Sequence, residues 1–229
     1  MMDGTRRSFD LEAIRADFPI LSREVHGKPL VYLDSAASAQ KPAQVLDALM
    51  SAYQDTYANV HRGLHFLSEA STDLYEAVRG KVAGFIGAAS GDEIVLTSGA
   101  TMSLNLIARC WAQPRLQPGD EILISIAEHH ANIVPWQMVA EATGARVRAF
   151  TLEDDGAFSM ARLKAEMSER TRIISVPHVS NVLGTVFPVA EIAELAHDAG
   201  ALMVVDGCQG VVHMPVDVTA LGADFYVFS

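Results

Sequence analysis

Asp206 lies at a position where burying a carboxylate is energetically unfavourable. It directly follows the five apolar residues of ALMVV, which read as a buried strand. A carboxylate at that point is partly desolvated and is costly without a positive partner. No Lys or Arg lies near it in the sequence. Asp206 therefore predicts either a cationic ligand group, such as a protonated pyridine nitrogen, or an ion pair with a distant Arg.

A second group of residues has the character of an anion site. Ser98, Gly99, Ala100 and Thr101 follow the apolar run EIVLT and lie at an expected helix start. Small residues there let backbone N–H groups and a hydroxyl approach an anion, and the helix dipole adds to the attraction. The alternative is a small-residue turn in which Thr101 only caps the helix.

Two further apolar runs are followed by polar side chains. Glu128, His129 and His130 come after EILISI. Two adjacent histidines cannot share one face, and a zinc site would need more ligands at suitable spacing. We therefore predict no metal site, one histidine at a ligand site and the other structural or exposed. Asn181 follows TRIISVPHVS, and its amide group could hydrogen-bond a ring substituent of a bound ligand.

These residues are positioned by an alternation of strand and helix patterns that starts near residue 93. Six strand-like runs are separated by helical patterns or crossovers: EIVLTS, EILISI, ARVRAFTL, TRIISVP, ALMVVD and DFYVFS. This rhythm predicts an α/β fold with a mainly parallel sheet covered by helices on both faces. Ligands of such sheets bind beyond the carboxyl ends of the strands, where the polar residues above fall. Gly144 and Gly200 are predicted left-handed helix caps.

Residues 1–92 have a different pattern, which we interpret as an N-terminal helical arm integral to the domain. It contains an amphipathic segment DLEAIRADF, a short strand LVYLD, a helix opened by Pro42 and a longer helix from about Ser68 to Ile86. Residues 93–229 are then an incomplete α/β large domain. Nothing resembling a linker or an internal repeat separates the two parts.

Composition narrows the class of protein. Half of the 229 residues are apolar and 20% are charged, which is typical of a globular chain. The formal net charge of −11 argues against nucleic-acid and anionic membrane partners. The first twenty residues lack a signal-peptide pattern, and no apolar run reaches the about 18 residues of a membrane span. With only Cys110 and Cys208, both expected to be structural and Cys110 to lie in a helix core, a cytoplasmic location fits best.

Together the strand ends offer an anion cradle, a neighbour for a flat ring, an amide and a buried carboxylate, the parts needed to hold pyridoxal 5'-phosphate (PLP). Several segments then closely resemble the group II, Suf-type cysteine desulfurases of the class-V aminotransferase family: YLDSAASAQKP, YANVHRG, EHHANIVPWQ, HVSNVLGT, HDAGALMVVDG and PVDVTALGADFYVFS. The likeness runs from about Asp10 to Ser229. It implies the large domain of the type I PLP-dependent transferase fold.

The resemblance also implies an activity and roles for single residues. The family converts L-cysteine to L-alanine and an enzyme-bound persulfide, which supplies sulfur for iron–sulfur cluster assembly through a sulfur-acceptor protein. Thr101 and Ser229 would contact the phosphate, and His129 would stack on the ring and assist proton transfer. Asp206 would pair with the ring nitrogen, and Asn181 and Gln209 would lie near the phenolic oxygen. His61 and Arg62 would line the substrate entrance, next to the partner of a homodimer.

The sequence departs from the family in two places. The phosphate loop, usually Arg-Gly-Thr-Thr-Glu, reads SGATM at 98–102, without the two charges and with Ala100 in place of one Thr. The Schiff-base lysine of the motif Phe-Ser-Gly-His-Lys is not among the four lysines before Ser229. We therefore expect an N-terminal portion truncated just before that lysine, without the small domain and inactive alone. The alternatives are a selenocysteine lyase or kynureninase-like class-V enzyme, or a non-catalytic truncated product.

Overall fold

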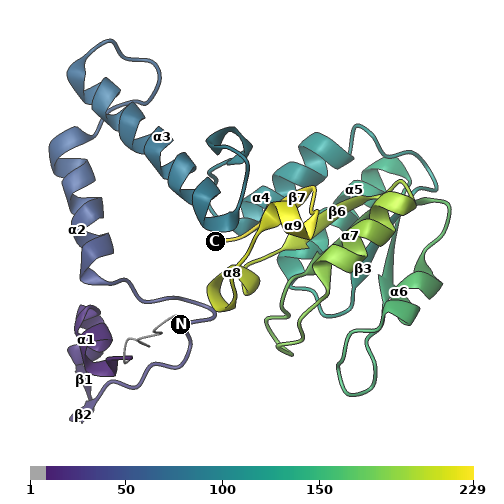
Figure 1. The fold of residues 1–229 in the computed structure, drawn as a ribbon, viewed down its shortest axis with the longest axis horizontal. Coiled ribbons are helices and arrows are strands. Elements are labelled where there is room, and N and C mark those ends of the chain that lie inside the picture. The colour runs from purple at the N-terminus through teal and green to yellow at the C-terminus, as the bar shows by residue number, and fades with distance from the viewer. Residues whose placement is uncertain (1–8) are drawn as a thin grey trace, which may run out of the picture. The chain divides into compact units, whose positions relative to one another are not determined.

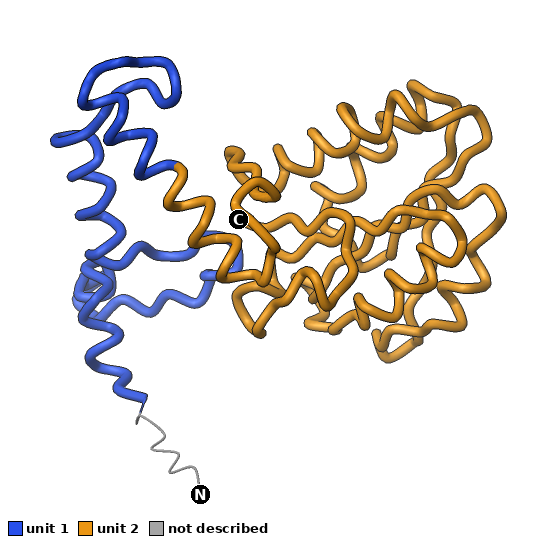
Figure 2. The backbone as a smooth tube through the Cα atoms, turned by 45° about the horizontal axis from the view of Figure 1, so that its top comes forward, with its two compact units in different colours: residues 1–75 blue, residues 76–229 orange. Residues whose placement is uncertain are grey.

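The structure, a computed structural model, describes residues 9–229. The chain divides into two compact units, residues 1–75 and 76–229, which are coloured separately in Figure 2. The division falls inside the long helix α3 (Phe66–Ile86). The first eight residues of the expected N-terminal arm lie outside the described part. The domain boundary between residues 92 and 93 stays a prediction.

The second unit is built around a parallel sheet of five strands in the order β4-β3-β5-β6-β7. Strands β3, β6 and β7 of this sheet are labelled in Figure 1. All four neighbouring pairs run parallel. The strands are β3 (Glu121–Ser125), β4 (Arg146–Phe150), β5 (Thr171–Pro177), β6 (Leu202–Asp206) and β7 (Phe225–Val227). The predicted α/β class with a parallel sheet is therefore confirmed.

Helices cover both faces of this sheet (Figure 1). Ile173 and Ile174 are neighbours in β5 and are both fully buried. Ile174 belongs to the core cluster that includes residues of α6 (Met160–Glu166) and α7 (Val189–Asp198). Ile173 belongs to the cluster with residues of α4 (Ala100–Leu106) and α5 (Val134–Thr143). Because both faces are buried, the inner strands β3, β5 and β6 are rich in apolar residues, whereas the edge strand β4 reads RVRAF and is mostly not buried.

Two glycines end the helices that lead back into the sheet. Gly144 follows α5 with φ +77° and ψ 8°, and Gly200 follows α7 with φ +71°. Both have the left-handed conformation predicted for these caps. A side chain at Gly144 would be crowded as well as strained, because a Cβ there would lie 3.2 Å from Cβ of Pro118.

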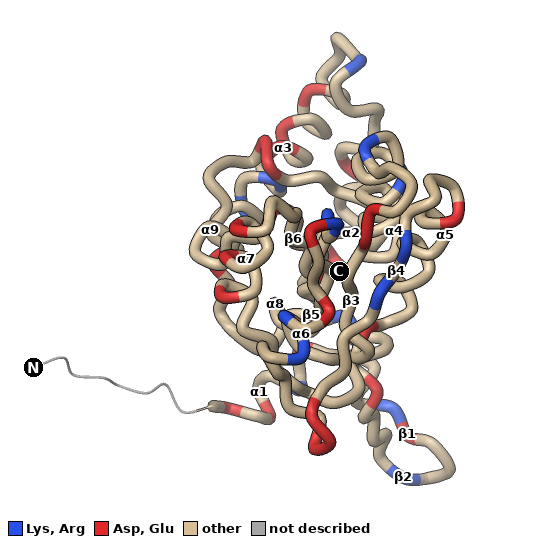
Figure 3. The backbone as a smooth tube through the Cα atoms, turned by 90° about the vertical axis from the view of Figure 1, so that its right-hand side faces the viewer, with Lys and Arg blue, Asp and Glu red and all other residues tan. Residues whose placement is uncertain are grey.

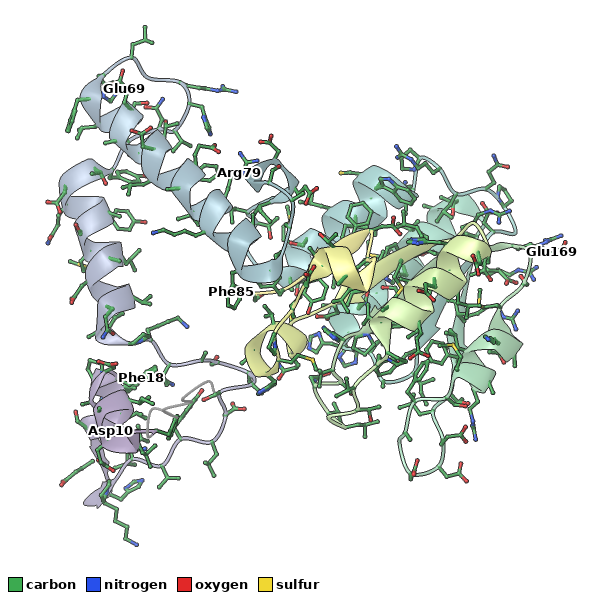
Figure 4. All side chains as sticks on the ribbon, viewed as in Figure 1. Asp10, Phe18, Glu69, Arg79, Phe85 and Glu169 are labelled. Carbon is green, nitrogen blue, oxygen red and sulfur yellow. The ribbon has the colours of Figure 1, made fainter. Side chains whose placement is uncertain are left out.

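One predicted strand of this unit is absent: residues 94–97 of EIVLTS belong to no sheet. Ile94 is buried, but it packs with Ala83 and Ile86 of α3. Its carbonyl accepts a hydrogen bond of 3.1 Å from Nε of Arg79, which is labelled in Figure 4. Ile94 thus contacts a helix and a guanidinium group, whereas the apolar pattern led us to expect neighbouring strands.

In the first unit, the predicted helices form but the predicted strand LVYLD does not. Val31 and Leu33 of that run are 77% and 93% exposed. With no buried face, strand propensity alone does not produce a strand. A two-residue ladder of β1 (Glu24–Val25) and β2 (Lys28–Pro29) precedes it instead.

The helices of the first unit begin at recognisable caps. Asp10 caps α1 (Leu11–Ala16), since its Oδ1 accepts a bond of 3.0 Å from the backbone N–H of Ala13. Pro42 immediately precedes α2 (Ala43–Ser51), as predicted. The remaining elements of the two units are η1 (Pro19–Ser22), η2 (Ala52–Thr56), η3 (Gly91–Glu93), η4 (Ile107–Ala112), η5 (His130–Asn132), α8 (Gly210–His213) and α9 (Val218–Leu221).

The charged residues are spread along the chain. Figure 3 shows Lys and Arg positions scattered among Asp and Glu positions. The whole sequence contains 17 Lys and Arg residues and 28 Asp and Glu residues. Within residues 9–229, no helix combines the length and the apolar character needed to cross a bilayer.

Candidate functional site

The parallel sheet brings the carboxyl ends of its strands to one edge, and predicted site residues gather there. His129 follows β3 and Asn181 follows β5. Asp206 is the last residue of β6, and its register partners are Pro177 of β5 and Val227 of β7. Ser229 comes two residues after the end of β7.

Asp206 is the most buried of the predicted site residues, with 7% of its surface exposed. Its Oδ1 accepts a hydrogen bond of 3.0 Å from the backbone N–H of Cys208. Among the described residues, no Lys, Arg or His forms an ion pair with it. The distant Arg left open by the sequence is thus not found in this part of the chain. A buried carboxylate without a counter-ion suits a cationic ligand group.

The charge of Asp206 acts on two neighbouring acids. Burial and then the Asp206 charge raise the pKa of the Cys208 thiol to about 12. Burial, followed by Asp206, also raises the pKa of the Tyr226 hydroxyl. Both groups therefore stay protonated at neutral pH, which fits the structural role predicted for Cys208. The expectation for Cys110 is wrong in one respect: this cysteine is exposed on η4 and is not in the core.

Ser229 and the start of α4 lie side by side although they are far apart in the sequence. The backbone N–H of Ala100 donates a bond of 2.9 Å to Oγ of Ser229. The N-cap of α4 is Gly99, with φ +111° and no side-chain cap. Thr101 is exposed in the first turn, so it is not the cap that the alternative interpretation required. A hydroxyl, a threonine and a helix start therefore meet where an anion would be stabilised.

His129 and His130 are both exposed. Nδ1 of His129 accepts a bond of 3.2 Å from the backbone N–H of Ala131 and so caps η5. The two imidazole rings stand 6.0 Å apart at an angle of 69°. The structure thus places His129 at the cap of η5, four residues beyond the end of β3, with its ring accessible to a ligand.

Asn181 and Gln209 line the same hollow, of about 590 Å³, in the second unit. They come from the segments after β5 and β6. Ser180, next to Asn181, is buried, and its Oγ donates to the carbonyl of Ala127 at 3.3 Å. The hollow is also lined by Val179, Ser180, Val182, Leu183, Gly184, Val186, His213 and Met214.

Glycines allow the segment after Asp206 to pack closely. A Cβ at Gly207 would lie 2.1 Å from Cε1 of Tyr226, and one at Gly210 would lie 2.5 Å from Nδ1 of His178. His178 and Tyr226 bond to each other through Nδ1 and the hydroxyl at 2.9 Å. Burial lowers the pKa of His178. This pair is therefore a neutral packing surface beneath the Asp206 segment.

His61 and Arg62 belong to the first unit and are both exposed. His61 has a φ of +66°, and its backbone N–H donates a bond of 2.9 Å to Oγ1 of Thr72. Its ring stands edge-on to Tyr75, with 5.6 Å between the ring centroids. Their role in substrate entry stays a prediction.

Sequence reasoning missed a buried polar network behind His129. Asn132, Trp136 and Ser175 are fully buried, and they connect to Glu128 through hydrogen bonds of 2.8 to 2.9 Å. The signal that could have found most of it is spacing. Glu128, Asn132 and Trp136 are four residues apart, the spacing at which polar side chains meet along a helical turn.

Comparison with known proteins identifies the family of this chain. The family model described as Aminotransferase class-V matches residues 31–229. A cysteine desulfurase from Enterobacter sp. (strain 638) is 53% identical over 222 residues, which are 97% of this chain and 55% of that protein.

Solved structures give the same result. The crystal structure of a cysteine desulfurase from Escherichia coli has a TM-score of 0.85 at 44% identity, over 96% of this chain and 54% of that one. The apo cysteine desulfurase from Thermococcus onnurineus NA1 has a TM-score of 0.86 at 37% identity, over 96% and 52%. The chain therefore spans about half the length of the relatives it matches.

Proposed function

Since the chain belongs to the class-V aminotransferase family, we propose that its residues serve the parent activity of a PLP-dependent cysteine desulfurase of group II, the Suf type. The observation that carries the proposal is Asp206, a buried carboxylate without an ion-pair partner among the described residues. It lies at the carboxyl edge of a parallel sheet, where such folds bind ligands. The names of the relatives supply the substrate class.

The residues at this edge fit PLP. When bound, PLP supplies a protonated ring that withdraws electrons from the substrate. Asp206 would keep the proton on the ring nitrogen, because its charge is not neutralised by another side chain of the described part. Ser229, Thr101 and the start of α4 would bind the phosphate, with Oγ of Ser229 already held by the N–H of Ala100.

The other residues would orient the ring and move protons. His129, exposed on its capped turn, would lie against the ring face and carry a proton to or from the substrate. Asn181 and Gln209, which share one hollow, would hydrogen-bond the phenolic oxygen. His61 and Arg62 would bind L-cysteine at the entrance.

The partners and the location belong to the same proposal. The homodimer and the sulfur-acceptor protein are implied by the resemblance, and the cytoplasmic location is favoured by the cysteine content of the sequence. Sulfur leaving L-cysteine as a persulfide needs a thiolate to receive it, and Cys208, whose pKa is raised to about 12, is unsuited to that role.

The experiment is a PLP titration of the chain, followed by absorbance of the cofactor and by tryptophan fluorescence. We expect saturable binding that Asp206→Asn weakens about 10- to 150-fold, because a hydrogen bond to a charged group contributes about 1.5–3 kcal/mol. Asp154→Asn, at an exposed aspartate on another loop, is the matched control. Because we expect this chain to be inactive alone, PLP binding is the readout, and alanine release from L-cysteine is not. Equal affinity of the two variants, or no saturable binding by the wild type, would contradict the proposal.

A further inference from the structure

Glu128 is a buried acid that the proposed function does not use. It lies between the end of β3 and His129. The residue as a whole is partly exposed, but its Oε1 is buried and has no hydrogen-bond partner among residues 9–229. Its Oε2 accepts one bond, of 2.8 Å, from Nδ2 of Asn132.

Asn132 connects Glu128 to the sheet and to the turn of His129. Its Oδ1 accepts bonds from Nε1 of Trp136 at 2.9 Å and from Oγ of Ser175, in β5, at 2.8 Å. Its backbone N–H donates to the carbonyl of His129 at 2.8 Å. The same residue thus holds the Glu128 carboxyl group and closes the turn that carries His129.

The surroundings of Glu128 favour its uncharged form. Within the described part of the chain, no cation forms an ion pair with it, and the nearby charge is the negative one of Asp206. Burial, and to a smaller extent Asp206, raise the pKa of Glu128 well above its usual value, although the bond from Asn132 opposes this.

Glu121, a buried glutamate on β3, has different partners from Glu128. Glu121 is 8% exposed, but its Oε2 lies 3.5 Å from Nη1 of Arg148 and accepts a bond of 2.6 Å from Oγ of Ser168. A guanidinium and a hydroxyl thus stabilise a charge on Glu121. Glu128 has neither kind of partner in these contacts.

We propose that Glu128 is a positioning residue for His129: its carboxyl group stays protonated and, through Asn132, holds the turn of His129 against the sheet. An ionised Glu128 would place a second negative charge beside Asp206. The protonated form leaves Asp206 as the charge that a cationic ligand group meets. The inference rests on the proposed function in one respect, the role of His129 in contacting the PLP ring and carrying a proton.

The protonation state can be measured without any ligand. The infrared spectrum of the whole chain at neutral pH should contain the carbonyl band of a protonated carboxylic acid, and Glu128→Gln should remove that band. Glu121→Gln is the matched control and should leave the band in place. Persistence of the band in Glu128→Gln would overturn the proposal.

The positioning role has its own readout. Glu128→Gln keeps an oxygen that can accept from Nδ2 of Asn132, whereas Glu128→Ala removes it. We expect hydrogen exchange at the amides of Ala131 and Asn132 to be about tenfold faster in Glu128→Ala than in Glu128→Gln, the equivalent of about one hydrogen bond. Equal exchange in the two variants would overturn the role.

PLP affinity separates this inference from the proposed function. Glu128→Ala should weaken PLP binding, and Glu128→Gln should recover most of the loss. If the wild-type chain binds no PLP, the proposed function fails while the infrared and exchange results still decide the state of Glu128. If PLP binds equally to both variants, the positioning role fails while the proposed function stands.

Discussion

The protonation of Glu128 predicts how the stability of the chain changes with pH. The folded-state pKa of Glu128 is raised above its unfolded value. The stability that Glu128 contributes is therefore fully present below the unfolded pKa, about 4.3, and is lost as the pH rises toward the folded pKa. Replacing Glu128 by Gln removes this dependence, because the amide does not titrate in this range.

The magnitude follows from the uptake of one proton on folding. Between the unfolded and the folded pKa of Glu128, the unfolding free energy of the wild type should fall relative to Glu128→Gln by up to about 1.4 kcal/mol per pH unit. His178, whose pKa is lowered by burial, also makes stability depend on pH. Its contribution is present in both proteins and cancels in the difference.

The assay is urea unfolding at a series of pH values, followed by tryptophan fluorescence. Trp136 is fully buried and bonds to Asn132 in the same network, so it reports on unfolding of this region. Glu121→Gln, which removes an ion-paired carboxylate, is the control that should not reproduce the effect. If the free energies of wild type and Glu128→Gln run parallel from about pH 5 to pH 8, Glu128 ionises normally and the reasoning is refuted.

Three further outcomes are expected. Gly207→Ala should lower the unfolding free energy in urea by about 1–3 kcal/mol, because its Cβ would lie 2.1 Å from the ring of Tyr226; an unchanged midpoint would contradict this. Tyr226→Phe should lower the same free energy by about 1 kcal/mol through loss of the 2.9 Å bond to His178. Iodoacetamide at neutral pH should alkylate exposed Cys110 before Cys208, whose thiol has a pKa of about 12; mass spectrometry of the peptides checks the order.

The sheet was predictable because its strands are buried on both faces. TRIISVP and ALMVVD are rich in apolar residues, and β5 and β6 form at these positions. EIVLTS is also rich in apolar residues, but only Ile94 of this run packs against α3, and Val95 is 74% exposed. A run of apolar residues therefore becomes a strand of this sheet only where the fold buries it between neighbouring strands.

Site residues that come at the carboxyl end of a strand could be predicted from the sequence. Asp206 was identified from its place after five apolar residues, and the structure finds it buried and without an ion pair in the described part. The partner of Asn132 on the sheet was not predictable in the same way. Ser175 lies 43 residues further along the chain, and its contact with Asn132 depends on the pairing of β3 with β5.

The negative charge of Asp206 contributes to the raised pKa values of three acidic groups at this edge of the sheet. Glu128, Cys208 and Tyr226 come from three different segments, and the charge of Asp206 contributes to raising the pKa of each. Burial is the first cause in every case, so Asp206 reinforces a tendency that their positions already create. The Asp206 carboxylate therefore lies among three acidic groups, Glu128, Cys208 and Tyr226, that stay protonated at neutral pH. A cationic ligand group beside Asp206 is therefore attracted by a single negative charge. When the ligand neutralises the charge of Asp206, the pKa values of Glu128, Cys208 and Tyr226 should fall. A pH titration of the chain with and without PLP would detect this change.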